Sequence, residues 1–187
     1  MDQHSTSHIV PAPGDTPLVM LFRHNLWANL RLIDTCLALD PVQLGETAAG
    51  TYGTIYDTLQ HIAGADQWYL SLLTGRRPPI RLRRGDHADL AVIREQAAIS
   101  GAGLIAAAAT VSPGDIVYMD DDDDKDLVWP TPATIILTQV INHATEHRSQ
   151  VMTLLTQLGM EPEELSGWTY MDANIKVTPI PRPKPAE

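Results

Sequence analysis

One stretch decides how this chain folds: residues 131–158, TPATIILTQVINHATEHRSQVMTLLTQL. Apolar side chains recur in it at alternating steps of three and four residues, a spacing that places them on one stripe of an α-helix. The stripe consists of Ile136, Val140, His143, His147, Val151, Leu154 and Leu158. Two histidines therefore occupy positions that the pattern would otherwise give to leucine.

His143 and His147 lie one helical turn apart with their rings on the same side, so they are close enough to hold one cation. Burial of both imidazoles without partners would be costly. The HxxxH spacing also arises by chance, and either ring could instead bond to a backbone carbonyl. The pattern alone indicates a metal site or a buried, hydrogen-bonded pair.

Two further amphipathic helices precede this stretch. The first is predicted from Leu18 to Asp40, where the following proline disfavours helix, and its apolar stripe is Phe22, Leu26, Leu30, Ile33 and Leu37. Its other face carries Trp27 and also His24, which we interpret as a surface residue or a neighbour of a site. The second is predicted from Thr54, which forms a capping-box-like pair with Asp57, to about Leu73, just before Gly75.

A third helix is predicted after Asp86, its expected N-cap, with the stripe Leu90, Ile93, Ala97, Leu104 and Ala108. Gly101 and Gly103 either weaken its middle or let a neighbouring helix approach closely. Residues 116–130 contain two β-prone runs around the acidic residues 120–124, which predicts a short hairpin or extended crossover with a solvated acidic turn. Thr131 and Pro132 are then the expected N-cap and first residue of the last helix.

Four amphipathic helices predict an all-α fold, a four-helix bundle. We assign residues 17–160 to the bundle, residues 1–16 to a flexible N-terminal arm that includes His4 and His8, and residues 161–187 to a C-terminal extension. The aromatic residues of this extension, Trp168 and Tyr170, are expected to pack on the bundle, and its proline-rich end is expected to be disordered.

Composition excludes several classes of function. There are 13 basic and 23 acidic residues, and the resulting net charge of −10 disfavours nucleic acid as a partner. The only basic cluster is the linker 76–85, which we interpret as a solvated loop, with recognition of an acid as an alternative that nothing else in the sequence supports. The single cysteine, Cys36, excludes an intrachain disulfide and is expected to pack as a small hydrophobe. No signal peptide or membrane-spanning segment is expected, so a soluble cytoplasmic protein is predicted.

Several short motifs resemble those of the DinB family, which includes YfiT-like metal-dependent hydrolases. In the first helix the motif is Trp27-Ala28-Asn29, and in the second it is Thr58-Leu59-Gln60-His61-Ile62 with Trp68. In the last helix it is His143-x-x-x-His147-Arg148-x-Gln150-Val151, followed by Leu158-Gly159. The resemblance extends from Leu18 to Gly159, whereas the acidic run and the proline-rich tail depart from the family pattern.

The resemblance implies a divalent metal ion held by His61, His143 and His147. Zinc, nickel and iron all suit nitrogen ligands, and three histidines leave the coordination sphere open, as in catalytic sites. The family includes transferases of low-molecular-weight thiols, such as bacillithiol, mycothiol or glutathione, and also hydrolases. We favour a thiol S-transferase with a small-molecule substrate, and the alternatives are a hydrolase or a non-catalytic metal- or ligand-binding stress protein. A homodimer is also implied. No residue is identified as catalytic.

Residues 143–147 also match HxxEH, the inverted zinc-peptidase motif in which the glutamate acts as general base. That motif belongs to a much larger α/β architecture with a distant glutamate ligand, and only a short tail follows here. We therefore interpret Glu146 as a charged residue on the flank of the helix, where it pairs with a neighbouring helix, with assistance at the metal site as the alternative.

Overall fold

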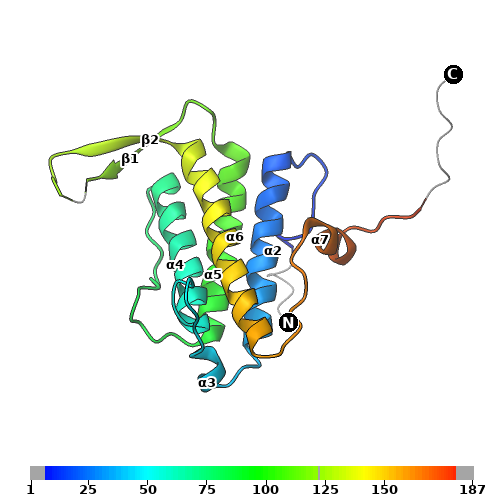
Figure 1. Cartoon of the computed structure of the whole chain (residues 1–187). Helices are drawn as coiled ribbons and strands as arrows, with labels where there is room; N and C mark the ends of the chain where they lie inside the picture. Colours follow the sequence, from blue (N-terminus) through cyan, green and yellow to red (C-terminus); the bar gives the residue numbers. More distant parts are fainter. Residues whose placement is uncertain (1–6, 122, 180–187) are drawn as a thin grey trace.

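The computed structural model describes residues 7–121 and 123–179, so His4, Asp122 and the proline-rich end beyond residue 179 lie outside the description. Four long helices form the body of the molecule, as the sequence predicts: α2 (Pro17–Cys36), α4 (Ile55–Thr74), α5 (Leu90–Thr110) and α6 (Ala133–Gln157). Helix α2 contacts α5 and α6, and α4 contacts the same two helices (Figure 1). The all-α four-helix bundle is confirmed.

The core is built from the predicted stripes. Phe22 and Leu26 of α2, Leu59 of α4, Ile93 of α5 and Val140 of α6 are all almost completely buried. Burial of each such side chain contributes roughly 1.5–3 kcal/mol, so the interlocked stripes are the main source of stability. Cys36 is also fully buried in this core, and burial raises the pKa of its thiol to about 12. It therefore behaves as a packed hydrophobe, as predicted.

Helix α5 lies close to both of its neighbours because of two glycines. A Cβ added at Gly101 would lie 2.5 Å from Leu26 of α2, and one added at Gly103 would lie 2.5 Å from Leu70 of α4. Of the two explanations for these glycines, the close approach of neighbouring helices is the one observed.

By length and composition α5 is long and apolar enough to span a membrane, contrary to our expectation for the sequence. Its contacts with α2 and α4 show that it is a core helix of the bundle.

The segment between α5 and α6 is an antiparallel hairpin that projects from one end of the bundle (Figure 1). Strand β1 (Ile116–Asp120) pairs with β2 (Val128–Pro132), with Ile116 opposite Pro132 and Asp120 opposite Val128. Asp121 closes the turn, because its carboxylate accepts the backbone N–H groups of Asp123 and Asp124. These hydrogen bonds and one from the Trp129 indole lower the pKa of Asp121. Among the described residues of the acidic run, Asp120, Asp123 and Asp124 are exposed, as predicted for a solvated turn.

The predicted end of the first helix is wrong. Helix α2 ends at Cys36, and Leu37, expected in the core, is 46% exposed. Asp40 and Pro41 do not stop this helix but begin another, the short helix α3 (Pro41–Leu44). The Asp40 carboxylate accepts the N–H groups of Val42 and Gln43, and proline suits the first helical position because it has no N–H to satisfy.

Two predicted N-caps are also wrong. Helix α5 begins after Asp89, while Asp86 accepts the Arg83 N–H in the preceding turn. Helix α6 begins after Pro132, because Thr131 and Pro132 are taken up by strand β2. The N-cap of α4 is correct, since the Thr54 hydroxyl accepts the Asp57 N–H, and Gly75 ends that helix in the left-handed conformation.

The C-terminal extension contains helix α7 (Gly167–Asn174), which the sequence did not predict and which lies beside α2 (Figure 1). Tyr170 packs edge-on against Trp27 and donates a hydrogen bond to the Ile9 carbonyl. Trp27 is therefore buried, although we placed it on the polar face of its helix. Trp168, also expected to pack, is 76% exposed. The boundaries of the arm and the extension remain predictions.

Candidate metal centre

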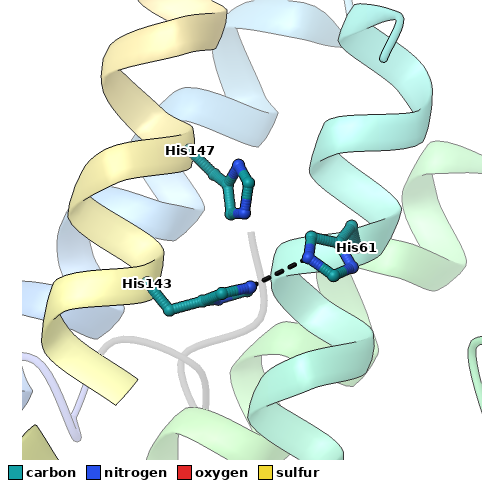
Figure 2. Close-up of side chains that lie close together, drawn as sticks. All are labelled: His61, His143 and His147. Atoms are coloured by element: carbon teal, nitrogen blue, oxygen red, sulfur yellow. Dashed lines mark hydrogen bonds between the residues drawn. The ribbon is translucent and has the colours of Figure 1, made fainter. Parts of the chain in front are cut away.

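Three histidines meet between helices α4 and α6. His61 projects from α4, and His143 and His147 project from successive turns of α6 toward it (Figure 2). One ligand nitrogen from each ring lies within 4.8 Å of the other two, an arrangement that can hold one metal ion. The Nε2 atoms of His61 and His143 are 2.9 Å apart. The structure therefore brings together all three residues that the sequence singled out.

Gln150, one turn beyond His147, orients that histidine. Its side-chain oxygen lies 2.9 Å from His147 Nδ1 and accepts the backbone N–H of Tyr52 at 3.1 Å. Because a backbone N–H can only donate, the oxygen end of the amide must face both groups. His147 then donates from Nδ1, which leaves a lone pair on Nε2 for a cation, the arrangement that outer hydrogen bonds commonly impose on metal-binding histidines.

Burial favours the neutral form of two of the imidazoles, those of His61 and His143. Burial, with the neighbouring His147 and Arg84 as smaller causes, lowers the pKa of His61 to about 4. Burial and the two other rings lower the pKa of His143 to about 4 as well. The Nδ1 atom of His143 is buried and has no hydrogen-bond partner in the described parts of the chain. Neutral rings with free lone pairs suit a divalent cation, so the donor set fits the metal that the family implies.

Aromatic side chains enclose the cluster. Tyr52 stacks on His61, with ring centroids 3.9 Å apart and planes inclined by only 9°, and it also meets His147 edge-on. Tyr69 packs edge-on against His143. His61 and His143 open onto a cavity of about 300 Å³, whose further lining residues include Asp57, Gln60, Trp68, Arg83 and Arg84. A small molecule can therefore reach the face of the cluster that the bundle does not fill.

A buried polar network lies beside the histidines. Arg148, adjacent to His147, donates to the side-chain oxygens of Asn25 at 2.6 Å and Asn29 at 2.7 Å. Asn29 in turn donates to Asp66 at 3.2 Å. Burial lowers the pKa of Arg148 to about 10 and raises that of Asp66 to about 7. The carboxylate and the guanidinium thus interact through the Asn29 amide across the core.

Other candidates from the sequence lie outside the cluster. His24 contacts the Leu165 carbonyl and the rings of Trp27 and Tyr170, so it belongs to the contact between α2 and α7. Glu146 is exposed and takes no part in the histidine cluster. Glu163, in the tail, pairs with Arg31 on the surface. The described residues therefore give the peptidase interpretation of HxxEH no support.

Sequence reasoning missed Tyr52 and the Asp66–Arg148 network. Tyr52 comes from a glycine-rich loop without periodicity, and its contact with Gln150 joins residues 98 positions apart. Arg148 did give a signal, because it lies on the flank of the apolar stripe, one residue after His147. An arginine there is most simply read as exposed, but it is only 6% exposed.

Comparison with known protein families agrees with this geometry. The model of the DinB family matches residues 14–182. The chain belongs to the DinB family. No curated protein matches it significantly in sequence. The match covers all four long helices, including α4 and α6, which carry the cluster, and it extends through α7, so the C-terminal helix lies within the DinB region.

The role of Gln150 can be tested in this DinB protein by substitution with leucine. We expect the variant to fold but to bind zinc about 10–100-fold more weakly, the usual effect of losing a hydrogen bond that orients a ligand. Competition with a chromophoric chelator measures the affinity. Gln157→Leu, at the exposed end of the same helix, is the matched control and should bind like the wild type. Equal affinities in all three proteins would show that Gln150 does not orient His147.

Proposed function

We propose that this DinB protein is a metal-dependent enzyme that transfers a low-molecular-weight thiol to an electrophile. The observation that carries the proposal is the cluster of three histidines with one face open to a cavity of about 300 Å³. A closed structural site would use a fourth protein ligand, whereas an open one leaves room for a substrate atom.

His61, His143 and His147 would hold the cation, identified here only as divalent, with zinc, nickel and iron as candidates. When bound, such a cation lowers the pKa of a thiol or water at its open position, which supplies a nucleophile near neutral pH. Gln150 fixes the tautomer of His147, and Tyr52 holds the His61 ring by stacking. The aromatic walls formed by Trp68 and Tyr69 suit an apolar electrophile.

The proposed reaction joins a thiol to a carbon that bears a leaving group. The sulfur forms a new bond to carbon, the bond from carbon to the leaving group breaks, and the thiol proton is released with the departing anion. No oxidant or reductant is needed. The residues of the chain bind and orient the reactants, and no side chain is assigned as a proton acceptor.

The test uses metal-loaded protein with glutathione, bacillithiol or mycothiol and an aromatic chloride as electrophile. We expect conjugation to exceed the uncatalysed rate with at least one thiol, and we expect this acceleration to disappear on chelation and in His61→Ala. A parallel panel of esters and amides measures hydrolysis. Hydrolysis alone, with the same metal dependence, would replace transfer by the hydrolase alternative. Stoichiometric metal without turnover in either panel would favour the non-catalytic binding protein.

We also propose that the enzyme works in the cytoplasm, as a homodimer, without nucleic-acid or membrane partners. The net charge of −10 supports the absence of a nucleic-acid partner. The burial of α5 against α2 and α4 accounts for its apolar sequence without a membrane and agrees with a soluble protein. The compartment and the dimer remain predictions.

A further inference from the structure

The loop of residues 80–88, which we call the strap, is fastened to helix α4. The Gln67 amide donates to the Ile80 carbonyl at 2.8 Å and accepts the Leu82 N–H at 3.0 Å. Gln60 donates to the Arg83 carbonyl at 2.6 Å, and Tyr56 donates to the Ala88 carbonyl at 2.8 Å. Arg81, Arg83 and Arg84 are exposed, as expected for a solvated loop, but the sequence did not predict that the second half of this linker is fastened to the bundle.

The close fit between strap and helix depends on a glycine. A Cβ added at Gly64 of α4 would lie 2.8 Å from the Leu82 carbonyl oxygen, a contact that real structures avoid. Gln60 and Gln67, which hold the strap from one turn on either side, are both buried. Buried amides that bond to backbone groups fix a loop more firmly than exposed contacts do. The strap is therefore placed at a defined position beside the histidine cluster.

This placement brings Arg83 and Arg84 to the cavity that His61 and His143 also line. The guanidinium carbon of Arg84 lies 5.5 Å from the centre of the Tyr52 ring, and the same ring stacks on His61. A guanidinium held by stacking against an aromatic ring keeps its N–H donors available. Within the described residues, neither arginine forms an ion pair with an acidic side chain.

The side chains that line the cavity carry more positive than negative charge, whereas the molecule as a whole is negatively charged. The chain as a whole carries −10, yet the cavity lining contributes two arginines and one acidic residue, Asp57. The Asp57 carboxylate accepts the Thr54 hydroxyl at 2.8 Å at the start of its own helix. Two cations without acidic partners beside an open cavity attract a substrate anion, and arginine forks match the geometry of a carboxylate.

We propose that Arg84, assisted by Arg83, binds a carboxylate of the thiol substrate and so selects thiols that carry one. This inference rests on the proposed function, because it names the substrate class of the same site. It favours acidic thiols such as glutathione over thiols without a carboxylate. Arg84 is a specificity-determining residue in this account and is not a metal ligand.

The test measures binding without turnover. S-Methylglutathione keeps both carboxylates but has no free thiol to coordinate a metal, and its diethyl ester removes the negative charges. We expect calorimetry on the metal-loaded wild type to detect the acid and to give at least roughly tenfold weaker binding of the ester, the scale of one charge-assisted hydrogen bond. Arg84→Gln should weaken binding of the acid by a similar factor and leave the weak binding of the ester unchanged.

Arg81→Gln is the matched control, because Arg81 is an exposed arginine of the same strap that does not line the cavity. It should bind the acid like the wild type. The proposal is overturned if the wild type does not prefer the acid, or if Arg84→Gln and Arg81→Gln have equal effects. Metal content, measured in each variant by mass spectrometry, should equal that of the wild type. A wild type that retains no metal would count against the proposed function, whereas an unchanged preference in Arg84→Gln counts only against this inference.

Discussion

Replacing His143 and His147 together with alanine should abolish metal binding. The wild type is expected to retain one divalent ion per chain after dialysis, because three nitrogen donors from α4 and α6 converge within 4.8 Å. The double variant keeps only His61, and a single imidazole on a helix surface cannot compete with water for the remaining positions. We expect the affinity to fall by more than about 100-fold, beyond the loss typical of an outer hydrogen bond. Metal content by mass spectrometry is the measurement.

His87→Ala is the matched control, because His87 is exposed in the strap and lies outside the cluster. It should retain the metal fully. Circular dichroism should show native helix content in the double variant, since the rings are replaced by a good helix former. Stoichiometric metal in the folded double variant would refute the histidine site and remove the basis of the proposed function.

Replacing Arg148 with methionine should have the largest effect on stability. Methionine fills much of the same volume, but it leaves Asp66 without a cation in the core, where Asp66 is only 1% exposed. Arg148 interacts with Asp66 through Asn29 and not directly, so we expect a cost of about 3 kcal/mol, the low end of the range for breaking a buried charge pair. The side chains of Asn25 and Asn29 also lose their donor. Urea denaturation measures the change. Arg31→Met, which breaks the exposed pair with Glu163, should cost less than about 1 kcal/mol.

The pH dependence of the stability of Arg148→Met distinguishes a loss of electrostatic interaction with Asp66 from a loss of packing. Burial raises the pKa of Asp66 in the folded state to about 7, from the ordinary aspartate value of 3.8. The folded state therefore binds more protons than the unfolded state between these values, and the contribution of this group to stability falls as pH rises through that window. Without Arg148 the pKa should rise further. The loss in free energy of unfolding caused by Arg148→Met should thus be smaller at about pH 5 than at about pH 8.

Adding Asp66→Asn to Arg148→Met gives the decisive comparison, because asparagine carries no charge to leave unpaired. We expect the double variant to be more stable at about pH 8 than Arg148→Met alone, with a favourable coupling energy between the two sites. If the two substitutions simply add, and the deficit does not depend on pH, then Arg148 stabilises the core by packing and not by its charge.

The sequence by itself determined the four helices and the three histidines. The periodicity of apolar residues predicted the core residues of α2, α4, α5 and α6, because apolar side chains repeated every 3.6 residues form one face of a helix, and that face is stable only when it is buried. HxxxH put two rings on one face for the same reason, and the family resemblance supplied His61. Local signals were less decisive where two structures compete for the same residues. Asp40-Pro41 both ends one helix and begins another, and Thr131-Pro132 suits a strand as well as an N-cap.

Only the tertiary structure decided what surrounds the histidines. Tyr52, Gln150 and Arg84 come from a loop, a helix and the strap, and no periodicity links them. The contact of Gln150 with Tyr52 forms where the loop before α4 meets α6. The position of Arg84 depends on where the strap crosses α4, which is set by the space at Gly64 and by the hydrogen bonds of Gln60 and Gln67 to the backbone of the strap. Arg148 lies in the core for a similar reason, since its acceptors on α2 exist only once α2 and α6 have packed. The helical repeat of apolar residues in the sequence indicates which face of each helix is buried. The partner of each buried polar side chain depends instead on which distant segments the tertiary structure brings together.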